Sequence, residues 1–493
     1  MRTNVFFRSL CFSLLALFLL FPRVLNLDAF HSPDEDRWTA NSAGFISSLA
    51  AGHWGDLMKL PHPGITTQWL GALSIRHDDW AMKKLPIVAG QALLILLAGY
   101  VFGRLWGFGG GFLTAIFLGV DPFIYAHTRV YGMDSLLALF TILCLGLLLL
   151  WNKNKEYRYL IFSGFCGAAA VLSKISGIII IPFILIAMVM LDDNRRLNKT
   201  YFIALLRKYS FWFFAFFISA LIILPSLAIN PQNILGDILE FFRSDEYGRY
   251  HVENYTYYWR SLVFFTNPIQ WIALFSCVGI LWVVLWKKIQ IRFNVKHVAI
   301  LMFFVLLFVL QMSTGKEKAD RYILSVFAIF DVVAAASMIA LVDLFRKYEK
   351  SLLPGILLAL ILSATAWQEN IIISLQPHGL SYVNPFTKHF FGGHRLGWGE
   401  GLDLAADYLN QKPNAKNLKV ASYYPNEFGK KFVGSTDPAD RFGEDGIDYV
   451  VLYRAMLERS GSWENDAFNY FIYKKPEKII YLDGIKYVWI YKK

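Results

Sequence analysis

Residues 133–151 have the sequence MDSLLALFTILCLGLLLLW, in which a single charged side chain, Asp134, precedes a run that contains no further charge. An α-helix needs roughly 20 mostly apolar residues to cross the hydrocarbon core of a bilayer. This stretch therefore predicts a membrane-spanning helix, and similar stretches lie on both sides of it. Eleven candidate spans are predicted in all: 5–25, 86–103, 108–127, 133–151, 159–173, 176–191, 210–229, 268–286, 297–312, 322–342 and 352–370.

The composition agrees with a polytopic α-helical membrane protein. The 493 residues are 56% hydrophobic and 17% charged, and the mean hydropathy is +0.42. A soluble domain would have about a quarter of its residues charged. The net charge of +11 is assigned to basic cytoplasmic loops, so no nucleic-acid partner is predicted. The four cysteines lie in apolar stretches and form neither a disulfide framework nor a metal-ligand spacing.

The first apolar run follows Arg2 and Arg8, which is a pattern that signal peptides share. No small-residue cleavage site follows it, so a retained first helix is predicted. Lys and Arg mark the short cytoplasmic loops of membrane proteins. With the N-terminus in the cytoplasm, basic clusters recur at every second loop. The opposite, external side of the cell membrane then receives the loop 26–85, the turn 121–133, the loop 230–267, the turn 313–321 and the tail from about 371.

The tail differs from the transmembrane domain, residues 1–370, in having few long apolar runs. Residues 371–493 predict a small external α/β domain, with a helix at Leu402–Leu409 and strands at Leu418–Tyr424, Asp448–Tyr453, Lys478–Leu482 and Ile485–Tyr491. The Asp483-Gly484 pair between the last two strands is a strong hairpin signal. No function is predicted for the segment Gly397-Trp398-Gly399-Glu400-Gly401.

Three successive acids, Asp34, Glu35 and Asp36, follow the first predicted helix in the stretch HSPDEDRW, residues 31–38. One interpretation is a carboxylate base or a metal ligand at the membrane surface. The other is the start of a solvated helix, because Ser or Asp near Pro is also a helix-capping pattern. The next residues, Trp38–Gly52, have apolar side chains at roughly helical spacing and predict an amphipathic helix in the interface.

Charged or polar residues also stand at the external ends of other predicted helices. Charged groups at membrane depth are costly and tend to mark sites, although each one alone could extend its side chain to the headgroups. The members of this set are His62 in a Pro-His-Pro turn, Arg129 and Asp134 before the fourth helix, Lys174 at the next external turn, and Lys316, Lys318, Arg321 and Tyr322 before a late helix. Asp331, inside a predicted helix, is interpreted as a helix–helix contact.

Taken together, these residues resemble the dolichyl-phosphate-mannose protein mannosyltransferase-like superfamily of GT-C membrane glycosyltransferases. That group includes the enzyme that adds aminoarabinose to lipid A. The resemblance covers about residues 1–345, and Pro33-Asp34-Glu35 is its most specific part. Gly64 stands where relatives of the lipid A enzyme have a second consecutive proline, and Leu324-Ser325 replaces the proline that commonly follows the Arg-Tyr pair.

The resemblance implies a sugar donor carried on a polyprenyl phosphate, which leaves without needing a general acid. Cations would stabilise the charge that develops on this phosphate. The candidates are Lys316, Lys318 and Arg321, followed by Arg129 and His62. The resemblance makes Asp34 the base that accepts the proton of the acceptor hydroxyl, with Glu35 orienting it, binding the acceptor or assisting a metal. Direct displacement with one base predicts inversion at the anomeric carbon. Asp36, Asp134, Lys174 and Tyr322 are further site candidates.

Three alternatives remain at this stage. An oligosaccharyltransferase-type enzyme would use a pyrophosphate carrier and a divalent metal, a cofactor that the phosphate-donor hypothesis does not require. A lipid or sugar transporter would show inverted repeats or paired broken helices, and neither is visible in the sequence. A membrane scaffold would leave the external charges unexplained. The sequence leaves open whether the acceptor is a lipid, a protein or a polysaccharide.

Overall fold

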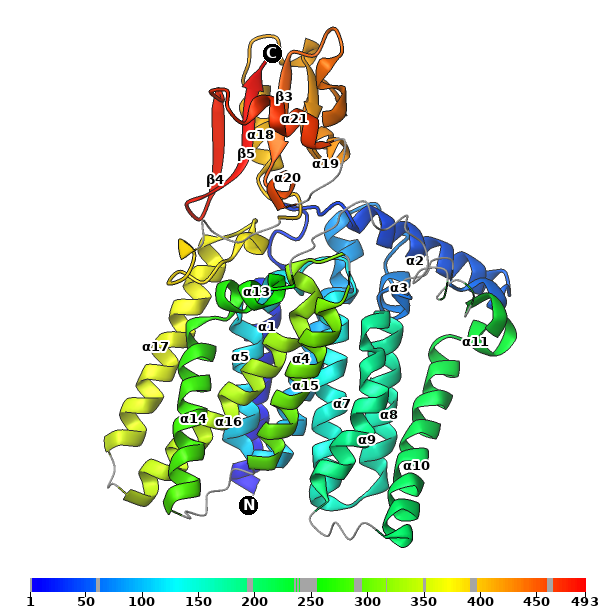
Figure 1. Ribbon diagram of the computed structural model, residues 1–493, viewed down its shortest axis with the longest axis vertical. Helices are drawn as coiled ribbons and strands as arrows, with labels where there is room; N and C mark the ends of the chain where they lie inside the picture. Colours follow the sequence, from blue (N-terminus) through cyan, green and yellow to red (C-terminus); the bar gives the residue numbers. More distant parts are fainter. Residues whose placement is uncertain are drawn as a thin grey trace.

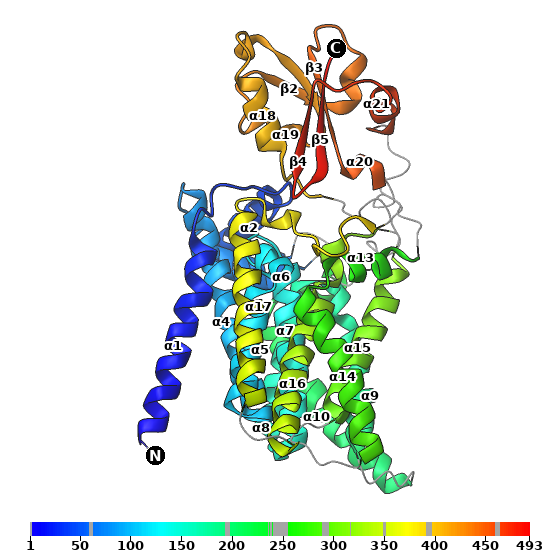
Figure 2. The same cartoon turned by 90° about the vertical axis from the view of Figure 1, so that its left-hand side faces the viewer.

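The computed structural model describes residues 2–58, 63–192, 198–234, 236, 239, 255–287, 295–315, 317–348, 352–390, 397–458 and 464–493. A bundle of long helices carries a small sheet domain at one end (Figure 1). The start of the first helix lies at the opposite end of the bundle, as the rotated view shows (Figure 2). The predicted fold class, a polytopic α-helical membrane protein with a small C-terminal α/β domain, is confirmed.

Each of the eleven predicted spans falls on a helix of the bundle. These helices are α1 (Arg2–Val24), α4 (Trp80–Trp106), α5 (Phe108–Val120), α7 (Asp134–Asn154), α8 (Tyr157–Ser173), α9 (Ile180–Leu191), α10 (Lys199–Ile223), α14 (Pro268–Lys287), α15 (Val295–Ser313), α16 (Leu324–Tyr348) and α17 (Leu352–Ser374). Among the described residues, six helices are long and apolar enough to cross a membrane, or seven if the bent pair α13 (Tyr257–Phe265) and α14 is one span. The count of eleven therefore stays a prediction.

One predicted span, 108–127, is divided in the structure. Helix α5 ends at Val120, and α6 (Pro122–His127) starts afresh two residues later. The reason is local, because Asp121 caps α6 by accepting a hydrogen bond from the Ile124 backbone N–H at 2.7 Å, and proline suits the first helical position.

Burial separates a central layer from a lipid-facing layer. In α7 and in the span that contains α16, 94% of the apolar window is buried, whereas the corresponding shares are 22% for α10 and 17% for α17. Large apolar side chains on the outer helices are exposed, among them Phe214, Ile222 and Leu360. Exposed apolar faces of this extent on several long helices are what a lipid environment requires. The chain is a multi-pass membrane protein.

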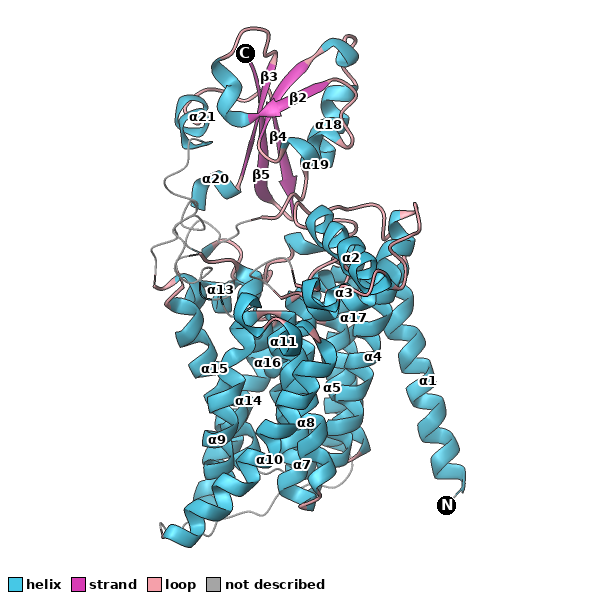
Figure 3. Ribbon diagram, turned by 90° about the vertical axis from the view of Figure 1, so that its right-hand side faces the viewer, coloured by secondary structure: helices cyan, strands magenta, loops and turns pink. Residues whose placement is uncertain are grey.

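Short helices lie at the end of the bundle that is nearer the sheet domain, among them α2 (Glu35–Ala50), α3 (Ile65–Ala72), α11 (Ser226–Ile229) and α13 (Figure 3). The chain before the sheet domain also has the 3-10 helices η1 (Trp54–Asp56), η2 (Ile175–Ile179), η4 (Asp320–Ile323) and η5 (Gly379–Ser381). Helix α2 is the predicted amphipathic helix, and it begins at Glu35 rather than at Trp38. Its buried face contains Trp38, Ser42, Phe45 and Ser48, which recur at helical spacing.

The C-terminal domain is a five-stranded mixed sheet of order β2-β1-β3-β5-β4. Its elements are α18 (Leu402–Asn410), η7 (Ala415–Asn417), β1 (Lys419–Ser422), α19 (Pro425–Gly429), β2 (Ser435–Pro438), η8 (Ala439–Gly443), β3 (Tyr449–Tyr453), α20 (Ala455–Glu458), α21 (Glu464–Phe471), β4 (Lys478–Leu482) and β5 (Ile485–Lys492). Strand β1 is parallel to β2 and β3, whereas β5 is antiparallel to β3 and β4.

The predicted helix and all four predicted strands of this domain are present. Asp483 and Gly484 have φ angles of 46° and 76°, as a tight two-residue hairpin turn requires. Strand β2 is not in the sequence prediction. It is a four-residue edge strand with the sequence STDP, and Asp and Pro have poor strand propensity.

Candidate active site

Asp34 lies at the N-cap position of α2, but its side chain makes no capping hydrogen bond. Its Oδ2 atom lies 3.2 Å from Nη2 of Arg321, which belongs to η4. The two residues are 287 positions apart, so the loop after the first helix and the turn before a late helix converge on one point. The capping interpretation therefore does not describe what this carboxylate contacts.

Arg321 also contacts a second carboxylate, that of Asp134, at the start of α7. Its Nε atom lies 3.5 Å from Oδ2 of Asp134, and Oδ1 of Asp134 accepts a hydrogen bond from Nζ of Lys174 at 2.7 Å. The Lys174 ammonium also lies 3.6 Å from the ring centroid of Tyr322. We call these five residues, Asp34, Asp134, Lys174, Arg321 and Tyr322, the Arg321 cluster. Negative and positive side chains alternate along its contacts, in the order Asp34, Arg321, Asp134 and Lys174.

Exposure differs sharply between the two carboxylates of the cluster. The Asp34 side chain is 40% exposed, whereas the Asp134 side chain is 9% exposed. Asp34 is therefore the carboxylate that is open to solvent, whereas Asp134 is enclosed with the two cations that it contacts. Among the residues that the structure describes, Nη1 of Arg321 has no hydrogen-bond partner, which leaves one edge of the guanidinium available to an anion.

Glu35 is closed to solvent, because its side chain has no exposed surface. Its carboxylate accepts hydrogen bonds from the backbone N–H groups of Ser32 at 2.8 Å and Tyr131 at 2.7 Å. It also pairs with Nζ of Lys84 at 2.9 Å. These contacts tie the loop that contains Asp34 to the start of α4 and to the turn before α7. The sequence prediction did not include Lys84, although a lysine at the start of an apolar helix is a signal that could have identified it.

Lys84→Met is expected to destabilise the protein by about 3–5 kcal/mol, because Glu35 would remain as an uncompensated buried charge. Lys83→Met is the matched control, since Lys83 forms no ion pair among the described residues. The midpoint of thermal unfolding in detergent measures the effect. The double variant Glu35→Gln/Lys84→Met should unfold at a higher temperature than Lys84→Met alone. Equal midpoints for Lys84→Met and Lys83→Met would show that the pair does not stabilise the fold.

The structure does not bring every predicted residue to the Arg321 cluster. The Arg129 guanidinium donates hydrogen bonds to Gln376 and to the carbonyl oxygens of Leu25 and Asn26. It therefore ties the turn after α6 to the backbone that follows α1 and to the segment after α17. Lys318 donates to the Gly315 carbonyl oxygen at 2.8 Å, within its own turn. His62 and Lys316 lie outside the described residues, as do residues 240–254 of the loop 230–267.

Gly64 precedes α3 and has a φ angle of +53°, in the left-handed region. A Cβ atom at this position would lie 2.1 Å from the Trp38 ring. Helix α2 packs the Trp38 ring directly onto this turn, so a side chain at position 64 would collide with it. The Gly64 N–H donates to the Ser173 carbonyl oxygen at 3.1 Å, next to Lys174, so the turn also supports the cluster.

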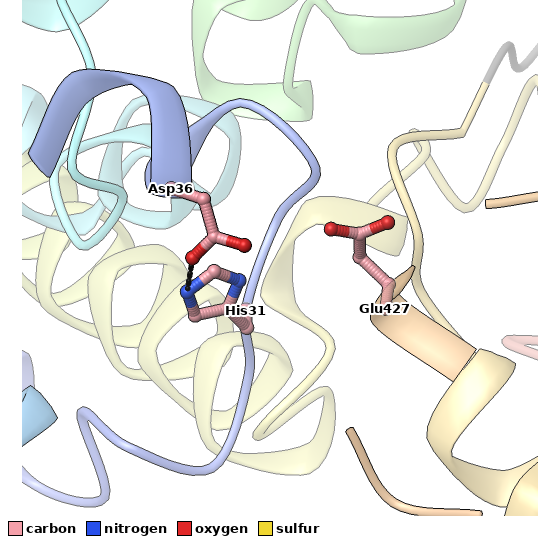
Figure 4. A group of neighbouring side chains, drawn as sticks. All are labelled: His31, Asp36 and Glu427. Atoms are coloured by element: carbon pink, nitrogen blue, oxygen red, sulfur yellow. Dashed lines mark ion pairs between the residues drawn. The ribbon is translucent and has the colours of Figure 1, made fainter. Parts of the chain in front are cut away.

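Asp36 lies in a second group of charges, between α2 and the C-terminal domain. His31, Asp36 and Glu427 each place a possible ligand atom within 4.8 Å of the others (Figure 4). Burial lowers the pKa of His31 and raises the pKa of Glu427. However, the Lys430 ammonium lies 2.7 Å from both Asp36 Oδ2 and His31 Nδ1. A divalent metal would have to displace this cation, so the group does not fit a metal site, and its contacts are those of an ion-pair junction.

The helical bundle with its attached sheet domain has the fold of solved GT-C glycosyltransferase structures. The predicted resemblance to the mannosyltransferase-like superfamily is confirmed. The family model described as dolichyl-phosphate-mannose-protein mannosyltransferase matches residues 62–223, which include Arg129, Asp134 and Lys174.

Solved structures of the same fold cover nearly the whole chain. ArnT from Cupriavidus metallidurans in the apo state aligns with a TM-score of 0.54 and 13% identity, over 99% of this chain and 98% of that one. The apo oligosaccharyltransferase from Archaeoglobus fulgidus aligns with a TM-score of 0.52 and 12% identity, over 94% of this chain and 72% of that one. The oligosaccharyltransferase AglB from the same organism, in complex with an inhibitory peptide and a dolichol-phosphate, has a TM-score of 0.50 and 13% identity, over 95% and 72%. No curated protein sequence matches the chain.

Proposed function

We propose that this protein transfers a sugar from a polyprenyl-phosphate donor to an acceptor hydroxyl group. The reaction would take place on the side of the membrane where the C-terminal domain lies, which the distribution of Lys and Arg predicts to be external. The contact between Asp34 and Arg321 supports this most strongly, because it joins a solvent-exposed carboxylate to a guanidinium that is only 14% exposed. The family description and the dolichol-phosphate bound to AglB support the choice of donor.

Arg321 would bind the donor phosphate. A guanidinium presents several N–H donors in a fixed plane and can hold two phosphate oxygens at once. In the free protein, Asp34 and Asp134 contact the Nη2 and Nε atoms. The phosphate would take Nη1 together with Nη2, so that Arg321 would leave Asp34 and retain Asp134. Lys174 would balance the charge of Asp134.

Asp34 would then act as the general base. Once Arg321 turns to the phosphate, the Asp34 carboxylate is free to accept the proton of the acceptor hydroxyl. The acceptor oxygen forms a bond to the anomeric carbon while the bond from that carbon to the phosphate oxygen breaks, and the polyprenyl phosphate leaves with the electron pair. One displacement of this kind inverts the anomeric configuration. Glu35, which does not reach the substrate, would position Asp34 through its contacts with Lys84 and Tyr131.

The alternative is an oligosaccharyltransferase-type reaction with a pyrophosphate carrier and a divalent metal. The structural likeness to AglB is compatible with this reaction, because it shows that the two proteins have a similar fold. Among the described residues, the group of possible metal ligands is His31, Asp36 and Glu427, which does not include Asp34. The Lys430 ammonium contacts two of its members, Asp36 and His31. The phosphate-donor reaction therefore has the stronger support.

The proposed function is tested with the purified protein, radiolabelled polyprenyl-phosphate hexoses and pentoses, and a membrane extract as the source of acceptors. We expect label to move into a lipid, protein or polysaccharide fraction, and to do so equally well in the presence of a chelator. A parallel reaction uses the same sugars on a pyrophosphate carrier. Transfer from pyrophosphate donors alone, abolished by the chelator, would support the oligosaccharyltransferase alternative instead.

A further inference from the structure

The glycine-rich segment Gly397–Gly401, which links the bundle to the C-terminal domain, lies against the Arg321 cluster. The Arg321 guanidinium carbon lies 3.9 Å from the ring centroid of Trp398. A guanidinium over a tryptophan face at this distance is a close cation–π contact. Arg321 is therefore held along two of its edges by carboxylates of the bundle and across one face by an indole from outside it.

The conformation of this segment is set by the C-terminal domain. Glu400 is fully buried and accepts hydrogen bonds from the Tyr453 hydroxyl at 2.7 Å and from the Trp398 backbone N–H. The Tyr453 hydroxyl oxygen accepts in turn from the Gly399 N–H at 2.8 Å. Tyr453 is the last residue of β3, in the middle of the sheet. The sheet therefore determines where the indole lies.

The segment also packs on the loop that contains Asp34. Gly397, Gly399 and Gly401 have φ angles of +78°, +101° and +84°, which L side chains rarely adopt. A Cβ atom at Gly399 would lie 3.3 Å from the Pro33 ring. The glycines thus let the backbone turn tightly next to the residue before Asp34, and this brings Trp398 onto Arg321.

Trp398 has little surface available to a substrate. Its side chain is 7% exposed and packs in a cluster with Ala126, Val130 and Leu380. Its ring also stacks near the His127 ring, with the centroids 6.4 Å apart. A sugar ring would need an open aromatic face, which this burial does not provide. The contact of this indole with the Arg321 guanidinium is therefore its main interaction with a charged group.

We infer that Trp398 is a positioning residue that holds the Arg321 guanidinium in the orientation required by the donor phosphate. The C-terminal domain would thus complete the donor site through one side chain. This inference rests on the proposed function, because it assigns Arg321 to the phosphate. It also explains why the segment combines three glycines with the buried Glu400. The glycines allow the tight turn, and Glu400 fixes the Trp398 backbone, so that the indole lies over the Arg321 guanidinium.

The test measures binding of undecaprenyl phosphate to the full-length protein in detergent, with neutral undecaprenol as the reference lipid. Trp398→Leu keeps an apolar side chain but removes the π face, and Trp398→Phe keeps a smaller π face. We expect the Kd for undecaprenyl phosphate to rise about tenfold in Trp398→Leu, equivalent to about 1.4 kcal/mol. Trp398→Phe should retain most of the affinity, and the Kd for undecaprenol should not change. Trp54→Leu, at an exposed tryptophan of η1, is the matched control.

The outcomes separate this inference from the proposed function. Unaltered protein that binds undecaprenyl phosphate no better than undecaprenol would overturn both. Selective binding by the unaltered protein with the same affinity in Trp398→Leu would overturn the positioning role alone. Equal losses in Trp398→Leu and Trp398→Phe, accompanied by equal losses of thermal stability, would also overturn it, because they would indicate a packing role.

Discussion

Asp34→Asn is expected to lower kcat for sugar transfer by roughly 10²–10⁴-fold, the range typical of removing a general base. Asparagine has nearly the same shape as aspartate but cannot accept the acceptor proton. Donor binding should be retained, and the KM for the donor should stay level or fall, because Arg321 would no longer have to leave a charged partner to bind the phosphate. Steady-state transfer with a purified polyprenyl-phosphate sugar measures both constants.

Asp56→Asn is the control for this variant. Asp56 belongs to the same predicted external loop and is exposed, and it lies in η1 rather than in the Arg321 cluster. Its kcat should match that of the unaltered enzyme. An Asp34→Asn variant with an unchanged turnover rate would remove Asp34 from the proposed chemistry, whatever the behaviour of the control.

Arg321→Ala is expected to lower kcat/KM for the donor by roughly 10²–10³-fold, as the loss of one preorganised donor to a developing anion does elsewhere. Arg321→Lys should retain more activity, because lysine keeps the charge but cannot hold two phosphate oxygens in a plane. The comparison is made over a range of donor concentrations, so that binding and turnover are separated. Equal losses in the two variants would argue against a two-oxygen contact with the phosphate.

Arg37→Ala is the control for the arginine series, because Arg37 is exposed on α2 close to Asp34 in the sequence. It tests whether loss of any positive charge near the site reduces donor use. Thermal unfolding must accompany both arginine measurements, since Arg321→Ala also leaves Asp134 with Lys174 as its remaining cation in the cluster. An activity loss that merely follows a loss of folded protein would not support the phosphate contact.

The Asp34–Arg321 contact links these two predictions. A base that is paired with the phosphate-binding cation before the donor arrives would be released when the donor binds. Such an arrangement would favour an ordered reaction, in which the acceptor is activated after the donor is in place. A fall in the donor KM of Asp34→Asn would be the measurable sign that the donor has to displace Asp34 from Arg321.

The sequence determined the helices and most of the small sheet. All eleven predicted spans fall on helices, because a lipid environment demands continuous apolar segments and internal backbone hydrogen bonding. The strands β1, β3, β4 and β5 were visible for a similar reason, since their apolar residues and the Asp483-Gly484 turn are local signals. Strand β2 was missed because it is a short edge strand with a polar sequence. The break at Asp121 was missed because a helix cap interrupts a continuous apolar pattern there.

The roles of neighbouring charges were decided by the tertiary structure. Asp34 and Glu35 are adjacent in the sequence, yet one carboxylate is reachable beside Arg321 and the other is buried against Lys84. Arg129 was a second candidate for the phosphate after Arg321, and packing directs its guanidinium to the backbone that follows α1 instead. Trp398 had no assigned role before its distance from Arg321 was known. Hydrophobic periodicity depends on near neighbours in the chain, whereas a charged side chain acquires its partner and its dielectric surroundings only when distant segments pack together.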